Sequence, residues 1–236
     1  MSEKTWQELT REDLDEITVR VLREGRGTRP EVRLISLRGE LAVSKDYGRG
    51  GTWFKRLLGF YLARREVAAL QRADGIPNIP HVLALSNASS IVMSYVDGVQ
   101  VTAAGDSDGF NDEFFEHLMT LINRLHERGV AHGDLEKLDN IMVTPDGEPA
   151  LVDFTSAIMS GASPIAALVL PEIMTNDVCA VYKLKAQLAP DLLRPDEERV
   201  LRERGKGEMW FRAQRRYVRS AVRALSSPGR PDPPAT

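Results

Sequence analysis

The chain has 236 residues, 42% of them hydrophobic, which is enough to bury a substantial core and to divide into two lobes. Its 31 basic and 34 acidic residues leave a formal charge of −3, so composition gives no support for a general nucleic-acid binder or a polybasic membrane protein. The single cysteine, Cys179, excludes an internal disulfide and a multi-cysteine metal site.

The amino-terminal residues bear on the location of the chain. Residues 1–16 are polar and acidic, whereas a signal peptide begins with basic residues followed by an apolar stretch. No window of the sequence approaches about 18 consecutive apolar residues, the length that a membrane-spanning helix needs. We therefore expect a cytoplasmic protein without a transmembrane segment.

The segment 31–47 predicts a β-hairpin. Its two β-branched runs flank Arg38-Gly39, a turn that glycine makes at little steric cost. A helix is expected after the glycine pair at 50–51. Within that helix, Glu66 shares a face with apolar residues at three-and-four spacing, so its carboxylate needs a partner.

The strand-like run at 90–96 ends at an Asp-Gly pair, and the boundary between the two lobes is placed there. Residues 1–96 then form an N-lobe with a nucleotide-binding sheet and a helix, and residues 97–226 form a C-lobe. The last ten residues, 227–236, are rich in proline and lack large apolar groups, which predicts a flexible tail.

Helices are expected to dominate the second half of the chain. Either Asn111 or Asp112 should cap an amphipathic helix that ends near Gly129. From about residue 176 to residue 226 the pattern is again helical, and its basic residues are interpreted as a solvated face rather than a nucleic-acid surface. The predicted fold class is α+β and bilobal, with a small β-rich N-lobe and a compact, mostly helical C-lobe.

Three polar side chains surround a second predicted hairpin, made of strands at 141–143 and 150–152. Asp134 precedes this hairpin, Asn140 opens it and Asp153 closes it. Pairing of the two strands brings Asn140 and Asp153 together as oxygen ligands for a hard cation. Phosphoryl transfer needs such ligands, a carboxylate that orients the attacking hydroxyl, and a cation near the phosphates. Each of these requirements has a candidate here.

These motifs resemble the catalytic and metal-binding loops of the protein-kinase superfamily, particularly its minimal bacterial branch related to RIO-type and lipopolysaccharide kinases. Residues 132–135, His-Gly-Asp-Leu, match the His-x-Asp-Leu motif. The resemblance implies that Asp134 is the catalytic base and that Asn140 and Asp153 bind Mg²⁺. It also suggests Lys137 as the loop lysine that neutralises the transferred phosphate.

The resemblance extends to the nucleotide site. Lys45 resembles the strand lysine that holds the phosphates of ATP, and Glu66, which lies 21 residues later, resembles its helix partner. Residues 25–32 are similar to the glycine-rich phosphate loop, except that Pro30 replaces its third glycine. The ATP-binding set that this implies is Gly25, Gly27, Val32, Val43, Lys45, Glu66, Met93 as the gatekeeper, the backbone of Ser94 and Val96, and Met142.

Several positions depart from the family pattern. Asn140 follows the catalytic aspartate by six positions, one more than in most such kinases, so the neighbouring Asp139 is kept as an alternative metal ligand. Gly133 replaces the arginine that binds a phosphorylated activation loop, and no Ala-Pro-Glu motif follows, so control by loop phosphorylation is not expected. Thr155 replaces the glycine of the metal-binding motif, which predicts a fixed, assembled site.

The resemblance implies transfer of the γ-phosphate of ATP, with Mg²⁺, to a hydroxyl. RIO-type enzymes point to a protein serine or threonine as the acceptor, whereas lipopolysaccharide kinases point to a sugar hydroxyl of a glycolipid. A small-molecule kinase of the antibiotic-phosphotransferase type is ranked third. Pro30 and Thr155 also leave open a nucleotide-binding pseudokinase that acts as a scaffold.

Overall fold

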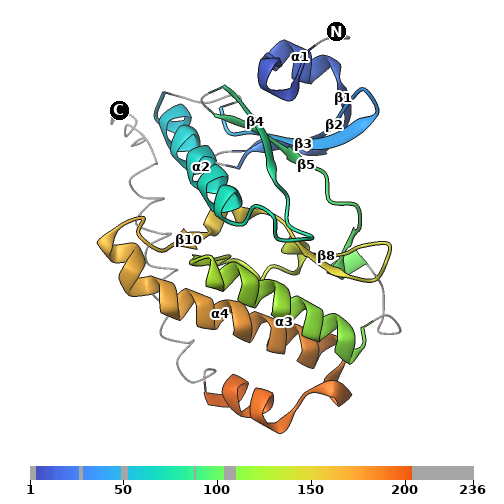
Figure 1. The fold of residues 1–236 in the computed structure, drawn as a ribbon, viewed down its shortest axis with the longest axis vertical. Coiled ribbons are helices and arrows are strands. Elements are labelled where there is room, and N and C mark those ends of the chain that lie inside the picture. Colours follow the sequence, from blue (N-terminus) through green and yellow to red (C-terminus); the bar gives the residue numbers. More distant parts are fainter. Residues whose placement is uncertain (1–3, 27–28, 49–52, 88, 104–109, 204–236) are drawn as a thin grey trace, which may run out of the picture. The chain divides into compact units, whose positions relative to one another are not determined.

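The computed structural model describes residues 4–26, 29–48, 53–87, 89–103 and 110–203 (Figure 1). Contacts divide the chain into two units, Met1–Leu192 and Leu193–Thr236. In the second unit the described part contains a helix at 195–203. Three predictions lie outside the described residues, namely those for Gly27, for the helical stretch at 204–226 and for the tail at 227–236.

A five-stranded antiparallel sheet forms the first part of the larger unit (Figure 1). The predicted hairpin is confirmed, because its two strands pair around Arg38-Gly39 with Val32 opposite Lys45. Both turn residues have positive φ angles, 55° and 84°, as two-residue hairpin turns require. In the order of the sheet, the strands are β1 (Thr18–Arg23), β2 (Glu31–Leu37), β3 (Glu40–Asp46), β5 (Ser90–Ser94) and β4 (Val82–Asn87).

The two faces of this sheet are covered differently, because successive side chains of a strand point to opposite faces. On the outer face, Ala42 and Val92 pack with Leu9 and Leu14 from the amino-terminal segment. That segment consists of η1 (Trp6–Glu8) and α1 (Arg11–Glu16), and it was not predicted. The opposite face carries Lys45, the residue expected to hold the phosphates of ATP, so this face forms part of the candidate site.

The long helix α2 (Trp53–Arg72) packs against β4 and β5 (Figure 1). It confirms the helix expected after residues 50–51. Ala69 and Leu70 on its inner side have no exposed surface, and Glu66 lies on the same side, also fully buried. The carboxylate therefore needs a partner within the protein, as the sequence led us to expect, because it has no surface exposed to solvent.

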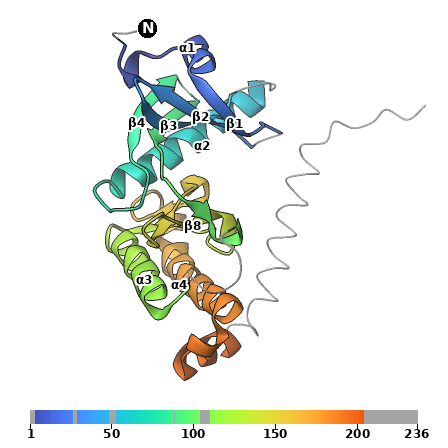
Figure 2. The ribbon, with the colours of Figure 1, turned by 90° about the vertical axis from the view of Figure 1, so that its right-hand side faces the viewer.

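The remainder of the larger unit is mostly helical. In α3 (Asp112–Glu127) the N-cap is Asn111, whose side chain accepts a hydrogen bond from the backbone N–H of Phe114, which decides between the two predicted caps. In both views the β6-β8-β9 sheet lies between the large sheet and the helices α3 and α4 (Pro164–Leu188) (Figures 1 and 2). The short elements are β6 (Val99–Gln100), η2 (Val101–Ala103), β7 (Val130–Ala131), η3 (Leu138–Asn140), β8 (Ile141–Val143), β9 (Pro149–Leu151), η4 (Phe154–Ser156), β10 (Ile158–Met159) and η5 (Pro190–Leu192).

Helix α4 (Pro164–Leu188) differs from two expectations. It begins twelve positions before residue 176, because Ser163 caps it and Pro164 occupies a first-turn position where no N–H is needed. By length and composition it is also apolar enough to cross a membrane, so the expectation that the chain has no transmembrane segment is not confirmed. Its buried residues include Asp177 and Lys185. The contacts of Asp177 described below show that this part of the helix packs against the loop at 132–133.

Candidate functional site

A cavity of about 500 Å³ opens between the large sheet and the β8–β9 hairpin. This volume lies in the range of small-molecule sites. Four of the predicted site residues are not part of its lining, namely Gly25, Glu66, Asp134 and Lys137. Gly27 lies outside the described residues. The predicted residues that do line the cavity are Val32, Val43, Lys45, Met93, Ser94, Val96, Asn140, Met142 and Asp153.

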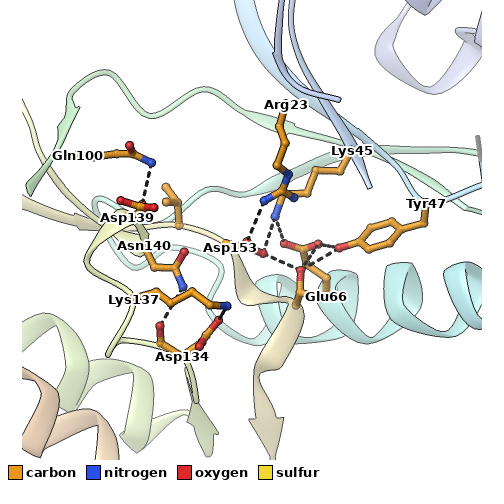
Figure 3. Close-up of polar contacts among 12 residues, drawn as sticks. Arg23, Lys45, Tyr47, Glu66, Gln100, Asp134, Lys137, Asp139, Asn140 and Asp153 are labelled. Atoms are coloured by element: carbon orange, nitrogen blue, oxygen red, sulfur yellow. Dashed lines mark hydrogen bonds and ion pairs between the residues drawn. The ribbon is translucent and has the colours of Figure 1, made fainter. Parts of the chain in front are cut away.

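Lys45 joins three elements at the inner end of this cavity (Figure 3). Its Nζ lies 2.6 Å from Oε1 of Glu66 on α2 and 3.0 Å from Oδ1 of Asp153, which follows β9. The lysine side chain is 6% exposed and the glutamate side chain is completely buried. The expected lysine–glutamate pair is therefore present, and Asp153 adds a second carboxylate to it.

The charges of this group stabilise one another. Burial alone would lower the pKa of Lys45, but the adjacent carboxylates of Glu66 and Asp153 outweigh it and raise that pKa. Burial alone would raise the pKa of Asp153, but the ion pair with Lys45 and a hydrogen bond from Thr155 hold it well below its usual range. Both groups are therefore charged at neutral pH.

Two hydroxyl groups outside the cavity lining, those of Tyr47 and Thr155, bind the carboxylates of Glu66 and Asp153. The Tyr47 hydroxyl donates a hydrogen bond to Oε2 of Glu66 and lies 2.9 Å from the Thr155 hydroxyl. Thr155 in turn contacts Oδ1 of Asp153 at 2.6 Å. Burial first, and then the neighbouring Glu66 carboxylate, raise the pKa of Tyr47, so its hydroxyl remains protonated.

The loop between β7 and β8 holds the other predicted polar residues. The side-chain amide nitrogen of Asn140 donates to the backbone oxygen of Asp134 at 2.9 Å, and the backbone N–H of Val152 donates to the backbone oxygen of Asn140 at 3.0 Å. These bonds tie the residue before Asp153 to the loop that carries Asp134. The ammonium group of Lys137 contacts the Asp134 carboxylate directly (Figure 3).

The backbone of the same loop is anchored from beneath by α4. Asp177 accepts hydrogen bonds from the backbone N–H groups of His132 and Gly133, at 2.7 Å and 2.9 Å. The His132 ring, which is fully buried, contacts the carbonyl of Val152 through Nε2 at 3.0 Å and packs on Phe154 at 4.8 Å between ring centres. Burial lowers the pKa of His132 and keeps the ring neutral.

The two candidate metal ligands at 139 and 140 have different surroundings. Asn140 is 5% exposed, and its amide nitrogen is fixed by Asp134, which turns its oxygen away from that bond. The Asp139 carboxylate accepts a hydrogen bond from the Thr102 hydroxyl at 3.0 Å, on the exposed side of the cavity. Asp153 has a left-handed backbone conformation, with φ of 66°. Asn140 and Asp153 thus offer the oxygen atoms that suit a magnesium ion.

The segment after Asp153 reaches α4 within eleven residues and contains no long loop. The Arg65 side chain on α2 donates to the backbone oxygens of Ser156 and Ala157 at 3.0 Å and 2.9 Å. Gly133 has φ of 76°, and a Cβ at this position would lie 2.8 Å from the oxygen of Ser156. The arginine that regulated kinases carry here would therefore clash.

A second cation that was not predicted faces the cavity. Arg23 on β1 has its Nη1 3.9 Å from Oδ2 of Asp153, and its side chain is 42% exposed (Figure 3). Arg20, on the same strand, also lines the cavity. Three cationic side chains, those of Arg20, Arg23 and Lys45, thus border a single cavity, which favours an anionic ligand.

Comparisons with known proteins identify the family and the fold of the chain. Residues 52–184, more than half of the chain, match the family described as "RIO domain". CBL-interacting protein kinase 25 of Oryza sativa subsp. japonica is 30% identical over 59% of this chain and 27% of its own length. Serine/threonine-protein kinase PEPKR2 of Arabidopsis thaliana is 31% identical over 59% of this chain and 33% of its own length. The chain therefore spans a third or less of these relatives.

Two solved structures are also similar. The Rio2 kinase from Chaetomium thermophilum matches with a TM-score of 0.54 and 22% identity, over 72% of this chain and 58% of that one. A complex of Rio2 kinase from the same organism, described as containing ADP/Mg²⁺-phosphoaspartate, matches with a TM-score of 0.55 and 20% identity, over 82% of this chain and 67% of that one. At these identities the likeness concerns the fold, and it confirms the predicted protein-kinase-like α+β architecture.

Proposed function

Since this chain belongs to the RIO domain family, we propose that it is an ATP-dependent protein kinase that transfers the γ-phosphate to a serine or threonine hydroxyl. The observation that carries the proposal is the ion-paired group of Lys45, Glu66 and Asp153 at the inner end of a cavity of nucleotide size. Phosphoryl transfer requires a cation at the phosphates and a carboxylate at the metal, held in fixed positions.

In this proposal each side chain has one task. Lys45 and Arg23 bind the phosphates, while Asn140 and Asp153 hold Mg²⁺, which supplies charge neutralisation for the phosphate oxygens when it is bound. Asp134 orients the acceptor hydroxyl and accepts its proton. Lys137, which contacts Asp134, is the candidate for stabilising the charge of the transferred group.

The adenine would lie in the apolar part of the cavity. Val32 and Val43 of the sheet line one side, and Met142 of β8 lines the other. Met93 is the gatekeeper, and the backbone groups of Ser94 and Val96 are the hydrogen-bonding partners proposed for the edge of the base. We also propose the cytoplasm as the location of the chain, and a glycolipid as an alternative acceptor to a protein.

The proposed activity is tested by incubating the chain with Mg²⁺, γ-labelled ATP and a cell lysate separated into protein, glycolipid and small-molecule pools. Label in the protein pool, stable to acid as phosphoserine and phosphothreonine are, is the expected result. Label in the glycolipid pool would instead support the lipopolysaccharide-kinase alternative. Nucleotide binding with label in none of the pools would support a scaffold without transfer activity.

A second candidate reaction is transfer of the γ-phosphate to a carboxylate of the chain itself. The description of the Rio2 complex names a phosphoaspartate, and here the Asp153 carboxylate lies between the cationic groups of Lys45 and Arg23, which would neutralise an acyl phosphate. An acyl phosphate is lost in hydroxylamine, whereas a phosphate ester is retained. Treatment of the labelled chain with hydroxylamine therefore separates the two reactions.

The choice of metal ligand leads to a separate prediction. We expect Asn140→Ala to raise the Mg²⁺ concentration needed for half-maximal activity by about 10–100-fold, a range typical of weakened metal sites. Asp139→Ala should change it by less than about threefold, because this carboxylate is bonded to Thr102 instead. The measurement is a magnesium titration at saturating ATP. The reverse order of the two effects would assign the metal to Asp139.

A further inference from the structure

We propose that Tyr47 and Thr155 are positioning residues that hold Glu66 and Asp153 in their binding arrangement before nucleotide or Mg²⁺ arrives. This inference rests on the proposed function, since it explains how the proposed nucleotide site stays assembled. It assigns a role to the Tyr47 hydroxyl, which no kinase motif includes, and to the hydroxyl of Thr155, which occupies the glycine position of the metal-binding motif. Neither residue lines the cavity.

The geometry that points to this role is a closed ring of contacts among five side chains from three parts of the chain. Of these side chains, Lys45, Tyr47, Glu66 and Asp153 are labelled in Figure 3. Lys45 Nζ binds Oε1 of Glu66 and Oδ1 of Asp153, at 2.6 Å and 3.0 Å. On the other side of the ring, Thr155 contacts Asp153 at 2.6 Å and Tyr47 at 2.9 Å, and Tyr47 donates to Oε2 of Glu66. Each carboxylate is therefore held by both a cation and a hydroxyl.

The second contact matters because one ion pair does not fix the orientation of a carboxylate. Lys45 alone would allow Glu66 and Asp153 to rotate about their side-chain bonds. The hydroxyls bind the second oxygen of Glu66 and add a donor at Asp153, so both groups have a single arrangement. Because Glu66 is completely buried, water does not replace a hydroxyl that is removed. The carboxylate then bears the full free-energy cost of the missing hydrogen bond.

The ring also connects the elements that must stay together. Tyr47 follows β3, Glu66 lies on α2, and Thr155 lies in η4 next to Asp153. Arg65, the neighbour of Glu66, reinforces the same junction through the backbone oxygens of the segment after Thr155. In a protein whose segment between Asp153 and α4 is short, these contacts supply the support that a phosphorylated loop supplies in regulated kinases.

The consequence is measurable as a difference between ligands. If the ring is broken, only a fraction of molecules has the binding arrangement, and the apparent dissociation constant rises by the inverse of that fraction. This applies to Mg·ADP, which needs Lys45 and Asp153. It does not apply to adenosine, whose contacts are the apolar walls and the backbone near Met93.

The experiment uses the full chain and three variants, Thr155→Val, Thr155→Ser and Tyr47→Phe, with titration calorimetry of Mg·ADP and of adenosine. Thr155→Val and Tyr47→Phe should each weaken Mg·ADP binding by about tenfold, as expected for one lost hydrogen bond to a charged group. Adenosine binding should stay within about twofold, and Thr155→Ser, which keeps the hydroxyl, should behave as the wild type. Thr120→Val and Tyr61→Phe, both at exposed positions, are the matched controls.

Hydrogen exchange of the ligand-free protein tests the ring without any nucleotide. Amides of α2 and of η4 should exchange faster in Thr155→Val than in Thr155→Ser, and Mg·ADP should reduce the difference. Equal exchange and equal Mg·ADP affinity in the valine and serine variants would overturn the positioning role. If the wild type binds no Mg·ADP but the valine and serine variants still differ in exchange, the proposed function is contradicted. The positioning role of the two hydroxyls is then still supported.

Discussion

Replacing Asp134 by asparagine is expected to lower the rate of phosphoryl transfer by about 10²–10⁴-fold, the usual contribution of a positioned general base. Asparagine has nearly the same shape but carries no charge and does not accept the proton of the hydroxyl. Asp134 is not part of the cavity lining, so the affinity for Mg·ATP should stay within about twofold. The two quantities are measured by single-turnover kinetics and by equilibrium binding.

The matched control for this substitution is Asp146→Asn. Asp146 lies at an exposed position in the turn between β8 and β9, so the same chemical change there should leave both the rate and the affinity unaltered. Full activity in Asp134→Asn would remove Asp134 as the proposed base. A parallel fall in rate and in affinity would mean that the substitution disturbs the nucleotide site through Asn140, whose side chain binds the Asp134 backbone.

The polar residues of the site could be predicted because short-range patterns determine them. Asp134, Asn140 and Asp153 flank a hairpin whose strands are pinned by a Pro-Asp-Gly turn, and the structure has β8 and β9 within one residue of the predicted strands. Glu66 was recognisable as a carboxylate on an otherwise apolar helix face. Patterns of this kind predict structure correctly because they depend only on residue spacing within one element or one turn.

The residues that were missed act through contacts between distant segments. Asp177 lies in a helix 44 positions after Gly133, whose N–H it binds, and only its place in an apolar run signalled that it needed a partner. Tyr47 stands two positions after Lys45 and so points to the same side of the chain, a signal that would have identified it. The start of α4 was missed because Pro171 in its interior reads as a helix breaker.

The amino-terminal layer was missed for a related reason. Leu9 and Leu14 are isolated apolar residues in a polar stretch, and their burial depends on the outer face of a sheet formed by residues far along the chain. A short helix such as α1 has too few residues to be stable by itself, so its sequence carries a weak signal. Tertiary packing, not local preference, decides its structure.

Substitution of Lys45 by methionine is expected to destabilise the chain by about 3–5 kcal/mol, because it leaves the Glu66 carboxylate buried without its cation. The same substitution should abolish the thermal shift that Mg·ATP produces in the wild type. Glu66→Met should cost less stability than Lys45→Met, since Lys45 keeps Asp153 as a partner at 3.0 Å. Comparing the free energies of unfolding of these two variants therefore tests whether Lys45, Glu66 and Asp153 form one ion-paired group.

The double variant, Lys45→Met with Glu66→Met, completes a thermodynamic cycle. Because it removes both buried charges, it should be more stable than Lys45→Met alone, with a coupling of about 1–3 kcal/mol between the two positions. Urea unfolding followed by circular dichroism measures the free energies. Additive effects on the free energy of unfolding would mean that the two side chains do not stabilise each other. If the two positions are coupled but Mg·ATP gives no thermal shift in the wild type, the ion pair has a structural role and no role in nucleotide binding.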